Sequence, residues 1–83
     1  MTKLIITNKK PYTNKAGEKV VQVETFLADI VSEDATYINF DVTEIISVEN
    51  KPSFYEPTQG GSIAKRFLAN YTGKVGMMTI AVA

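Results

Sequence analysis

The chain has no cysteine and no histidine among its 83 residues. These two residue types provide the commonest general base, the usual zinc ligands and the thiol nucleophile of enzymes. Catalysis by carboxylates alone would remain, but the nine acidic residues are spread over alternating strand positions and a turn, as on a solvated surface. We therefore expect a protein that is not an enzyme and that uses no metal ion or other cofactor.

Long apolar runs are also missing. The run Leu4-Ile5-Ile6 is too short for a signal peptide, and no run approaches the ~20 residues that a membrane-spanning helix needs. The lack of cysteine suits a reducing cytoplasm, although it is compatible with any compartment. We expect a cytoplasmic protein that does not insert into a membrane.

Length and composition are those of an ordinary globular domain. The chain is 45% hydrophobic and 22% charged, which argues against disorder. We expect one domain over residues 1–83 that buries roughly 60–65% of its unfolded surface, so that association with other chains would add to its stability.

The formal net charge of zero hides a segregation along the chain. Residues 1–23 hold five lysines and one glutamate, residues 24–56 hold eight acids and one lysine, and the charged residues of 57–83 are three basic ones. If the two basic ends meet in space, they make one positive surface.

Residues 19–48 are the most informative stretch, because their alternation predicts two long strands. Apolar residues occupy mostly odd positions in the first strand and even positions in the second. A four-residue loop at 32–35 would place Leu27 opposite Phe40, so that both apolar sets share one face. Asp29 and Glu44 then fall on the buried face, which predicts a β-bulge or a bend there.

The segments before this hairpin predict a short strand and a basic loop. Residues 2–7 are rich in isoleucine and threonine, as in a strand. Residues 8–19 carry four lysines around Tyr12, a proline, and at 14–17 the residue types of a hairpin turn. This loop could hold phosphates and a stacked base, or its lysines could keep an exposed edge strand soluble.

The segments after the hairpin predict a long connection, a helix and a last strand. Residues 50–61 contain Phe54 and Tyr55, which could plug one end of a barrel or, beside Lys51, stack on bases. Residues 62–73 predict a short helix that ends at a glycine. Residues 74–83 are almost wholly apolar, as in a strand that is central in a closed sheet or lies at a subunit interface.

The predicted fold class is mainly β with one short helix, in the order β-β-β-α-β. This order resembles the OB-fold, a small Greek-key barrel. The predicted helix at 63–68, Gly73 and the strand at 75–82 are similar to the last third of small single-stranded-DNA-binding proteins of bacteria, phages and plasmids. The resemblance implies an OB-like barrel that is completed within the chain or by dimerisation.

The same resemblance implies a non-catalytic protein that binds single-stranded DNA, or RNA, in replication or recombination of a phage or other mobile element. Binding would be cooperative, with a homo-oligomer formed through the C-terminal strand in the cytoplasm of the host. The expected phosphate contacts are Lys9, Lys10, Lys15, Lys19, Lys65, Arg66 and Lys74. The expected stacking residues are Tyr12, Tyr55 and, on the outer face of the hairpin, Phe26 and Tyr37.

Two other functions fit the same sequence. A small protein-binding inhibitor or assembly factor could use the acidic middle of the chain to occupy a basic site on a protein partner. Its contact residues would be Glu33, Asp34, Asp41, Glu44 and Glu49. Alternatively, the chain could be a structural subunit whose apolar last strand builds an oligomer.

Overall fold

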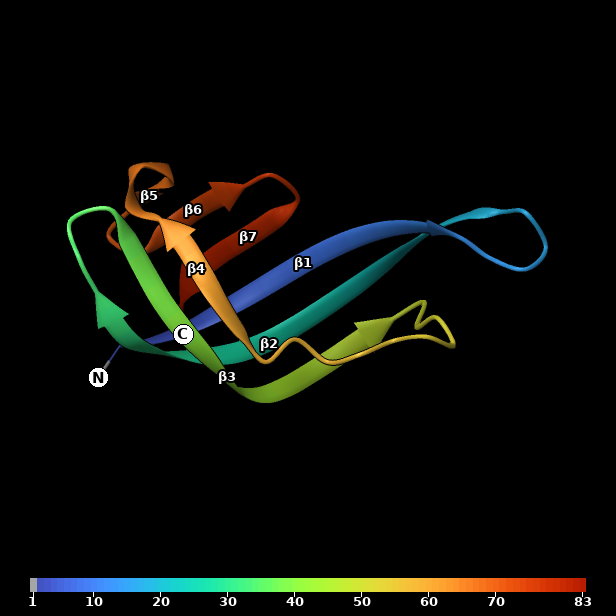
Figure 1. Ribbon diagram of the computed structural model, residues 1–83, viewed down its shortest axis with the longest axis horizontal. Helices are drawn as coiled ribbons and strands as arrows, with labels where there is room; N and C mark the ends of the chain where they lie inside the picture. Colours follow the sequence, from blue (N-terminus) through green and yellow to red (C-terminus); the bar gives the residue numbers. More distant parts are fainter. Residues whose placement is uncertain (1) are drawn as a thin grey trace.

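The computed structural model describes residues 2–83, which form one antiparallel sheet of seven strands that curls into a half-barrel (Figure 1). The order in the sheet is β4-β3-β2-β1-β7-β6-β5, so β4 and β5 are its two edges. Among the described residues, no helix is long and apolar enough to cross a membrane. The elements are β1 (Lys3–Thr13), β2 (Lys19–Glu33), β3 (Tyr37–Glu49), β4 (Gly60–Ala64), the 3-10 turn η1 (Lys65–Phe67), β5 (Leu68–Ala69), β6 (Thr72–Val75) and β7 (Met78–Val82).

The core fills the inner face of the curled sheet. The Phe26 and Phe40 rings stack there with centroids 6.1 Å apart. Buried aliphatic residues from four strands surround them, because alternate residues of each strand point inward. These residues are Leu4, Ile6, Ala28, Ile63 and Ile80.

The face of β2 that packs on the core is opposite to the predicted one. Phe26 and Ala28 are 1% and 0% exposed, whereas Val31 is 57% exposed. The prediction was wrong because of the register. Next to the turn Glu33 pairs with Ile38, and the irregularity between Ser32 and Ile30 then places Phe40 opposite Ile30 instead of Leu27. That three-residue shift is odd, so it exchanges the two faces of the strand.

In β3 the prediction holds for the first half of the strand only. Ile38 and Phe40 are buried as expected. The register then shifts twice against β2, as happens at β-bulges, so that Ile45 packs on the core and Ile46 is 46% exposed. One of these irregularities adjoins Glu44, which confirms the predicted disturbance there and leaves Glu44 exposed.

Strand β1 is longer than predicted, since it runs through Pro11 to Thr13. The pairing of β1 with β7 ends at Asn8, and the Lys9 amide donates to the Met77 carbonyl at 3.2 Å. Odd-numbered amides of this part of β1 therefore point away from β2. The missing N–H of Pro11 thus removes no bond between β1 and β2.

The hairpin turn predicted at 14–17 is confirmed. The Asn14 side-chain carbonyl accepts hydrogen bonds from the Ala16 and Glu18 amides at 3.0 and 2.9 Å. Gly17 has φ +79°, a left-handed conformation that glycine adopts without strain. The basic segment is therefore an ordered hairpin and not a mobile loop.

The helix predicted at 62–73 is absent: these residues form β4, η1, β5 and β6. Asn70 and Tyr71 have φ of 52° and 63°, which no right-handed helix accommodates, and they turn the chain between β5 and β6. Ile63 is buried opposite Ile38 in the sheet. Burial of this side chain and pairing with β3 outweigh the weak stability of a short isolated helix.

The last predicted strand is a hairpin of β6 and β7. Strand β7 lies between β1 and β6, which agrees with a central position in the sheet. It pairs with β1 over Met78–Val82 and with β6 over Met78–Ile80. Backbone pairing of this strand with another chain is therefore left to Ala81 and Val82.

We expect Phe26→Ala to lower the free energy of unfolding by about 3–5 kcal/mol, because it leaves a cavity beside Phe40. The matched change on the outer face of the same strand, Val31→Ala, should cost less than about 0.5 kcal/mol. Urea-induced unfolding measures both values. Equal losses for the two variants would contradict this assignment of the faces of β2.

Candidate functional site

The β1–β2 hairpin extends beyond the core as a two-stranded arm, here defined as residues 9–23 (Figure 1). The connection between β3 and β4, residues 50–59, lies against the arm. The Tyr12 hydroxyl donates to the Asn50 carbonyl at 2.8 Å. The rings of Tyr12 and Phe54 meet edge to face, with centroids 5.8 Å apart, so arm and connection meet at an aromatic pair.

A cleft of about 480 Å³ opens between the hairpin turn and the connection; we call it the Tyr12–Phe54 cleft. It contains two aromatic rings and two lysines, and none of its lining residues is acidic. Phe54 is 69% exposed. Exposed rings can stack on planar groups, and lysines can bind phosphates. The lining residues are Tyr12, Thr13, Asn14, Lys15, Ala16, Lys51, Pro52, Ser53 and Phe54.

A smaller hollow adjoins the cleft on the other side of Phe54. Lys10, Gln22 and Tyr55 line it, together with Glu56. The Lys51 ammonium lies 5.2 Å from the centre of the Tyr55 ring, within the range of a cation–π contact. The hollow therefore adds a lysine and a ring to those of the cleft.

Glu24 holds the connection in place from inside the structure, where its side chain is 1% exposed. Its carboxylate accepts hydrogen bonds from the Tyr55 hydroxyl at 2.5 Å, from the Thr58 hydroxyl at 2.5 Å and from the Thr58 amide at 3.2 Å. A buried carboxylate needs such partners. The connection supplies them, and this fixes its path.

The pKa values of the same groups reflect this arrangement. Burial alone would raise the pKa of Glu24, but the hydrogen bonds from Thr58 and Tyr55, with the Lys10 charge nearby, outweigh it and lower the pKa. Burial and the Glu24 carboxylate raise the pKa of Tyr55 to about 12. At neutral pH the contact therefore joins a carboxylate to a protonated phenol.

Part of the predicted site gathers around the cleft, and one neighbouring pair is split. Lys9 and Lys10 are adjacent in a strand and therefore point to opposite faces. Lys10 lines the hollow, whereas Lys9 lies on the other face of the arm. The predicted residues that line the cleft or the hollow are Lys10, Tyr12, Lys15 and Tyr55. Lys19 pairs with Thr13 and shares the face of Lys9 and Val21.

Phe26 is not available for stacking, because it belongs to the core. Its predicted place on the outer face was wrong for the same reason as the face of β2: the odd shift in register. Tyr37 is 48% exposed as expected, but it follows the β2–β3 turn, at the end of the sheet away from the arm (Figure 1).

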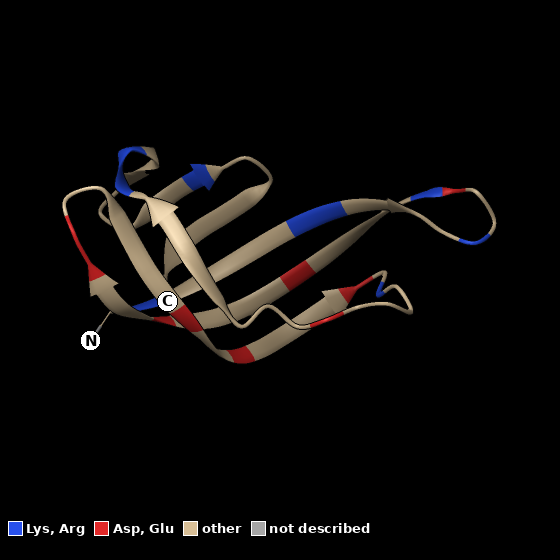
Figure 2. Ribbon diagram, viewed as in Figure 1, with Lys and Arg blue, Asp and Glu red and all other residues tan. Residues whose placement is uncertain are grey.

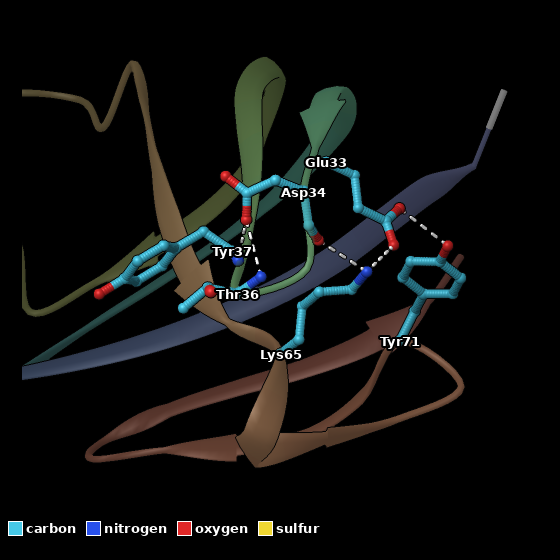
Figure 3. Close-up of polar contacts among 6 residues, drawn as sticks. All are labelled: Glu33, Asp34, Thr36, Tyr37, Lys65 and Tyr71. Carbon is cyan, nitrogen blue, oxygen red and sulfur yellow. Dashed lines mark hydrogen bonds and ion pairs between the residues drawn. The ribbon is translucent and has the colours of Figure 1, made fainter.

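Lys65 is held by acidic partners and not free for phosphates. Its ammonium pairs with the Glu33 carboxylate at 2.5 Å and donates to the Asp34 carbonyl at 2.9 Å (Figure 3). The Tyr71 hydroxyl donates to Glu33 at 2.9 Å. The Glu33 contact raises the pKa of Lys65, and the contacts from Lys65 and Tyr71 lower the pKa of Glu33.

The remaining predicted cations lie near Lys65. The Arg66 guanidinium is 4.8 Å from the centre of the Phe67 ring, and Lys74 is exposed on β6. Figure 2 shows these residues around η1 and β6, apart from the lysines of the arm. The basic residues thus form two groups and do not merge into one patch.

The acids also divide into engaged and free ones. Glu33 pairs with Lys65, and Asp34 accepts hydrogen bonds from two amides of its own turn. Strand β3 carries acidic residues along its length (Figure 2). They are exposed, and they are Asp41, Glu44 and Glu49. Within residues 2–83 the ion pairs are Lys3–Asp29 and Lys65–Glu33, so these three acids have no cationic partner there.

Lys51 and Phe54 line the cleft, although they were not among the expected site residues. The signal in the sequence was an aromatic pair beside a lysine in a proline-containing connection. The sequence did not show which of the two rings of this connection faces the arm. Glu24 decides it, because its carboxylate binds the Tyr55 hydroxyl and Phe54 is left beside Tyr12.

No family model, curated protein or solved structure matched this chain. Among the residues that the structure describes, no cluster of three or more potential acidic, cysteine or histidine ligands is arranged to hold a metal ion. The groups that the Tyr12–Phe54 cleft presents are aromatic rings, lysine ammonium groups and small polar side chains.

We expect Glu24→Gln to lower the free energy of unfolding at neutral pH by about 1–3 kcal/mol, because it removes the charge from three hydrogen bonds. A carboxyl with a lowered pKa stabilises the fold above its unfolded value of 4.5 and loses this contribution as the pH falls through the folded value. The variant should therefore lose less stability than the wild type on acidification. The pKa values of Glu33 and Asp34 are also lowered, so the stability of the variant still depends on pH to a smaller extent.

Urea unfolding at a series of acidic pH values measures this difference. Absorbance of the phenolate in an alkaline titration provides a second measurement, since the pKa of Tyr55 should fall from about 12 toward 10 in Glu24→Gln. If both titrations match those of the wild type, Glu24 does not anchor the connection.

Proposed function

We propose that the protein binds single-stranded nucleic acid, without catalysis, at the Tyr12–Phe54 cleft. A base packs against the exposed rings, while Lys15 and Lys51 contact the phosphates on either side. The observation that carries the proposal is the combination, in one open cleft, of two rings and two lysines with no acidic residue in its lining. Acids in this position would repel a polynucleotide.

The fold supports the proposal at a coarser level. Strands β1, β2 and β3 follow one another in the sheet, and the last strand returns to pair with β1. We infer that this half-barrel is of the OB-like class, and its hairpin between the first two strands corresponds to one of the loops with which such barrels bind oligonucleotides. Seven strands and a 3-10 turn replace the five strands and helix of that pattern.

The proposed binding tolerates many sequences, because every base has a flat face for stacking and lysines contact any phosphate. DNA and RNA both present these groups. A role in replication or recombination of a phage or mobile element is part of the proposal and is supported by the resemblance of the sequence. Arg66 and Lys74, at the far side of a chain 44 Å long, form a second place where the backbone of a longer strand could be held.

A second candidate function is the binding of a basic protein partner by the acids of β3. The exposed positions of Asp41, Glu44 and Glu49 favour it. Glu33 and Asp34 no longer count toward that surface, because both are engaged within the chain. Reversal of Asp41 and Glu44 should abolish capture of such a partner and leave oligonucleotide binding unchanged.

We expect Tyr12→Ala and Phe54→Ala each to weaken binding to oligo-dT by about 1–3 kcal/mol, the contribution of one stacked base. Tyr12→Phe keeps the ring and should bind within about threefold of the wild type. Tyr37→Ala, remote from the cleft, is the matched control. Anisotropy of a labelled oligonucleotide at low salt measures the affinities, and the proposal fails if wild-type protein at tens of micromolar leaves the signal unchanged.

The salt dependence of binding should identify the phosphate contacts. For single strands each contact contributes about 0.7 to the slope of log affinity against log salt concentration. Lys15→Ala and Lys51→Ala should each reduce the slope by about this amount. Lys65→Ala should not, because its ammonium pairs with Glu33; an equal reduction in all three variants would show that the cleft is not the contact site.

A further inference from the structure

The arm has a second face, opposite the cleft, on which Lys9, Pro11 and Val21 are exposed. Beyond Asn8, strand β1 pairs only with β2, so the far part of the arm is a two-stranded ribbon. Two-stranded ribbons are marginally stable unless a face is packed against something. Val21, on this outer face, is 40% exposed, and Pro11 lies opposite it.

Charge is ordered across this outer face. Lys9 is the neighbour of Val23 on β2, and Val23 is the neighbour of Glu49 on β3, so the three side chains form one row on one face. The row has a positive end, an apolar centre and a negative end. With strands about 4.8 Å apart, Lys9 and Glu49 are separated by about 10 Å across Val23, and neither forms one of the two ion pairs found among residues 2–83.

Such a row is complementary to itself after a half-turn. A twofold axis along β2, above the outer face, exchanges the positive and the negative ends and leaves the apolar centre in place. We propose that the outer face of the arm binds the same face of a second copy of this chain. Lys9 then lies over the partner's Glu49 and Glu49 over the partner's Lys9, with Val21 and Val23 packed in the middle. Lys19, two residues before Val21 on the same face, comes beside the partner's Lys19, a repulsion that the two opposite-charge contacts outweigh.

This geometry yields a closed dimer, because both copies use the same patch. Facing sheets pack about 10 Å apart, a gap that a lysine and a glutamate side chain can bridge together. The cleft lies on the opposite face of the arm, so the dimer leaves it open. The inference therefore stands independently of the proposed binding of nucleic acid.

Charge reversal tests the pairing directly. In the Lys9→Glu variant both interface contacts join two glutamates, and in the Glu49→Lys variant both join two lysines. Each variant should therefore dimerise at least tenfold more weakly than the wild type. Sedimentation velocity at low salt measures the dimerisation. An equimolar mixture of the two variants restores both opposite-charge contacts and should form a heterodimer. Lys74→Glu and Glu56→Lys make the same charge changes away from the face and should dimerise like the wild type.

The apolar centre gives a second test, since Val21→Asp should also abolish dimerisation. Circular dichroism and urea midpoints of every variant check that the monomer remains folded. The inference is overturned if wild-type protein stays monomeric up to about 1 mM, which would leave the face to a different partner. It is also overturned if folded single variants dimerise as the wild type does, or if their mixture stays monomeric.

Discussion

The turn after β2 is the constraint from which most of the structure follows. The Asp34 carboxylate accepts hydrogen bonds from the Thr36 and Tyr37 amides, both at 2.7 Å (Figure 3), and these backbone contacts lower its pKa. An Asx-type turn of this kind is tight. It sets Glu33 opposite Ile38, and the register shift between Ser32 and Ile30 then sets Ile30 opposite Phe40. Turn and register shift together decide which face of a fifteen-residue strand is buried.

The even-numbered side chains of β2 point to the buried face of the sheet. Glu24 is therefore buried together with Phe26. A charged group in that place is costly unless hydrogen bonds compensate it. The connection after β3 folds back to provide them through Tyr55 and Thr58, and so carries Phe54 to Tyr12 on the arm. The candidate site is thus a consequence of how one buried carboxylate is satisfied.

The same alternation separates the charges of the arm into two roles. Lys10 faces the cleft side, while Lys9 joins Val23 and Glu49 on the outer face. We propose one surface of the arm as the site for a polyanion and the other as the site for a second copy of the chain. Neighbouring lysines in a strand cannot serve the same surface unless the strand twists between them, so a count of basic residues in the sequence overstates either surface.

Local chemistry in the sequence determined the mainly β class, the hairpin turn at 14–17, the buried positions at the start of β3 and the long aromatic connection, because turn residues and short-range alternation act over a few residues. The tertiary structure alone decided the rest. Helical spacing at 62–71 was overridden by pairing of Ile63 with β3 and by the left-handed turn at Asn70 and Tyr71. The buried face of β2 was ambiguous because both of its faces are partly apolar. Two features outside the alternation, the Asp34 turn and the register shift between Ile30 and Ser32, decided between them.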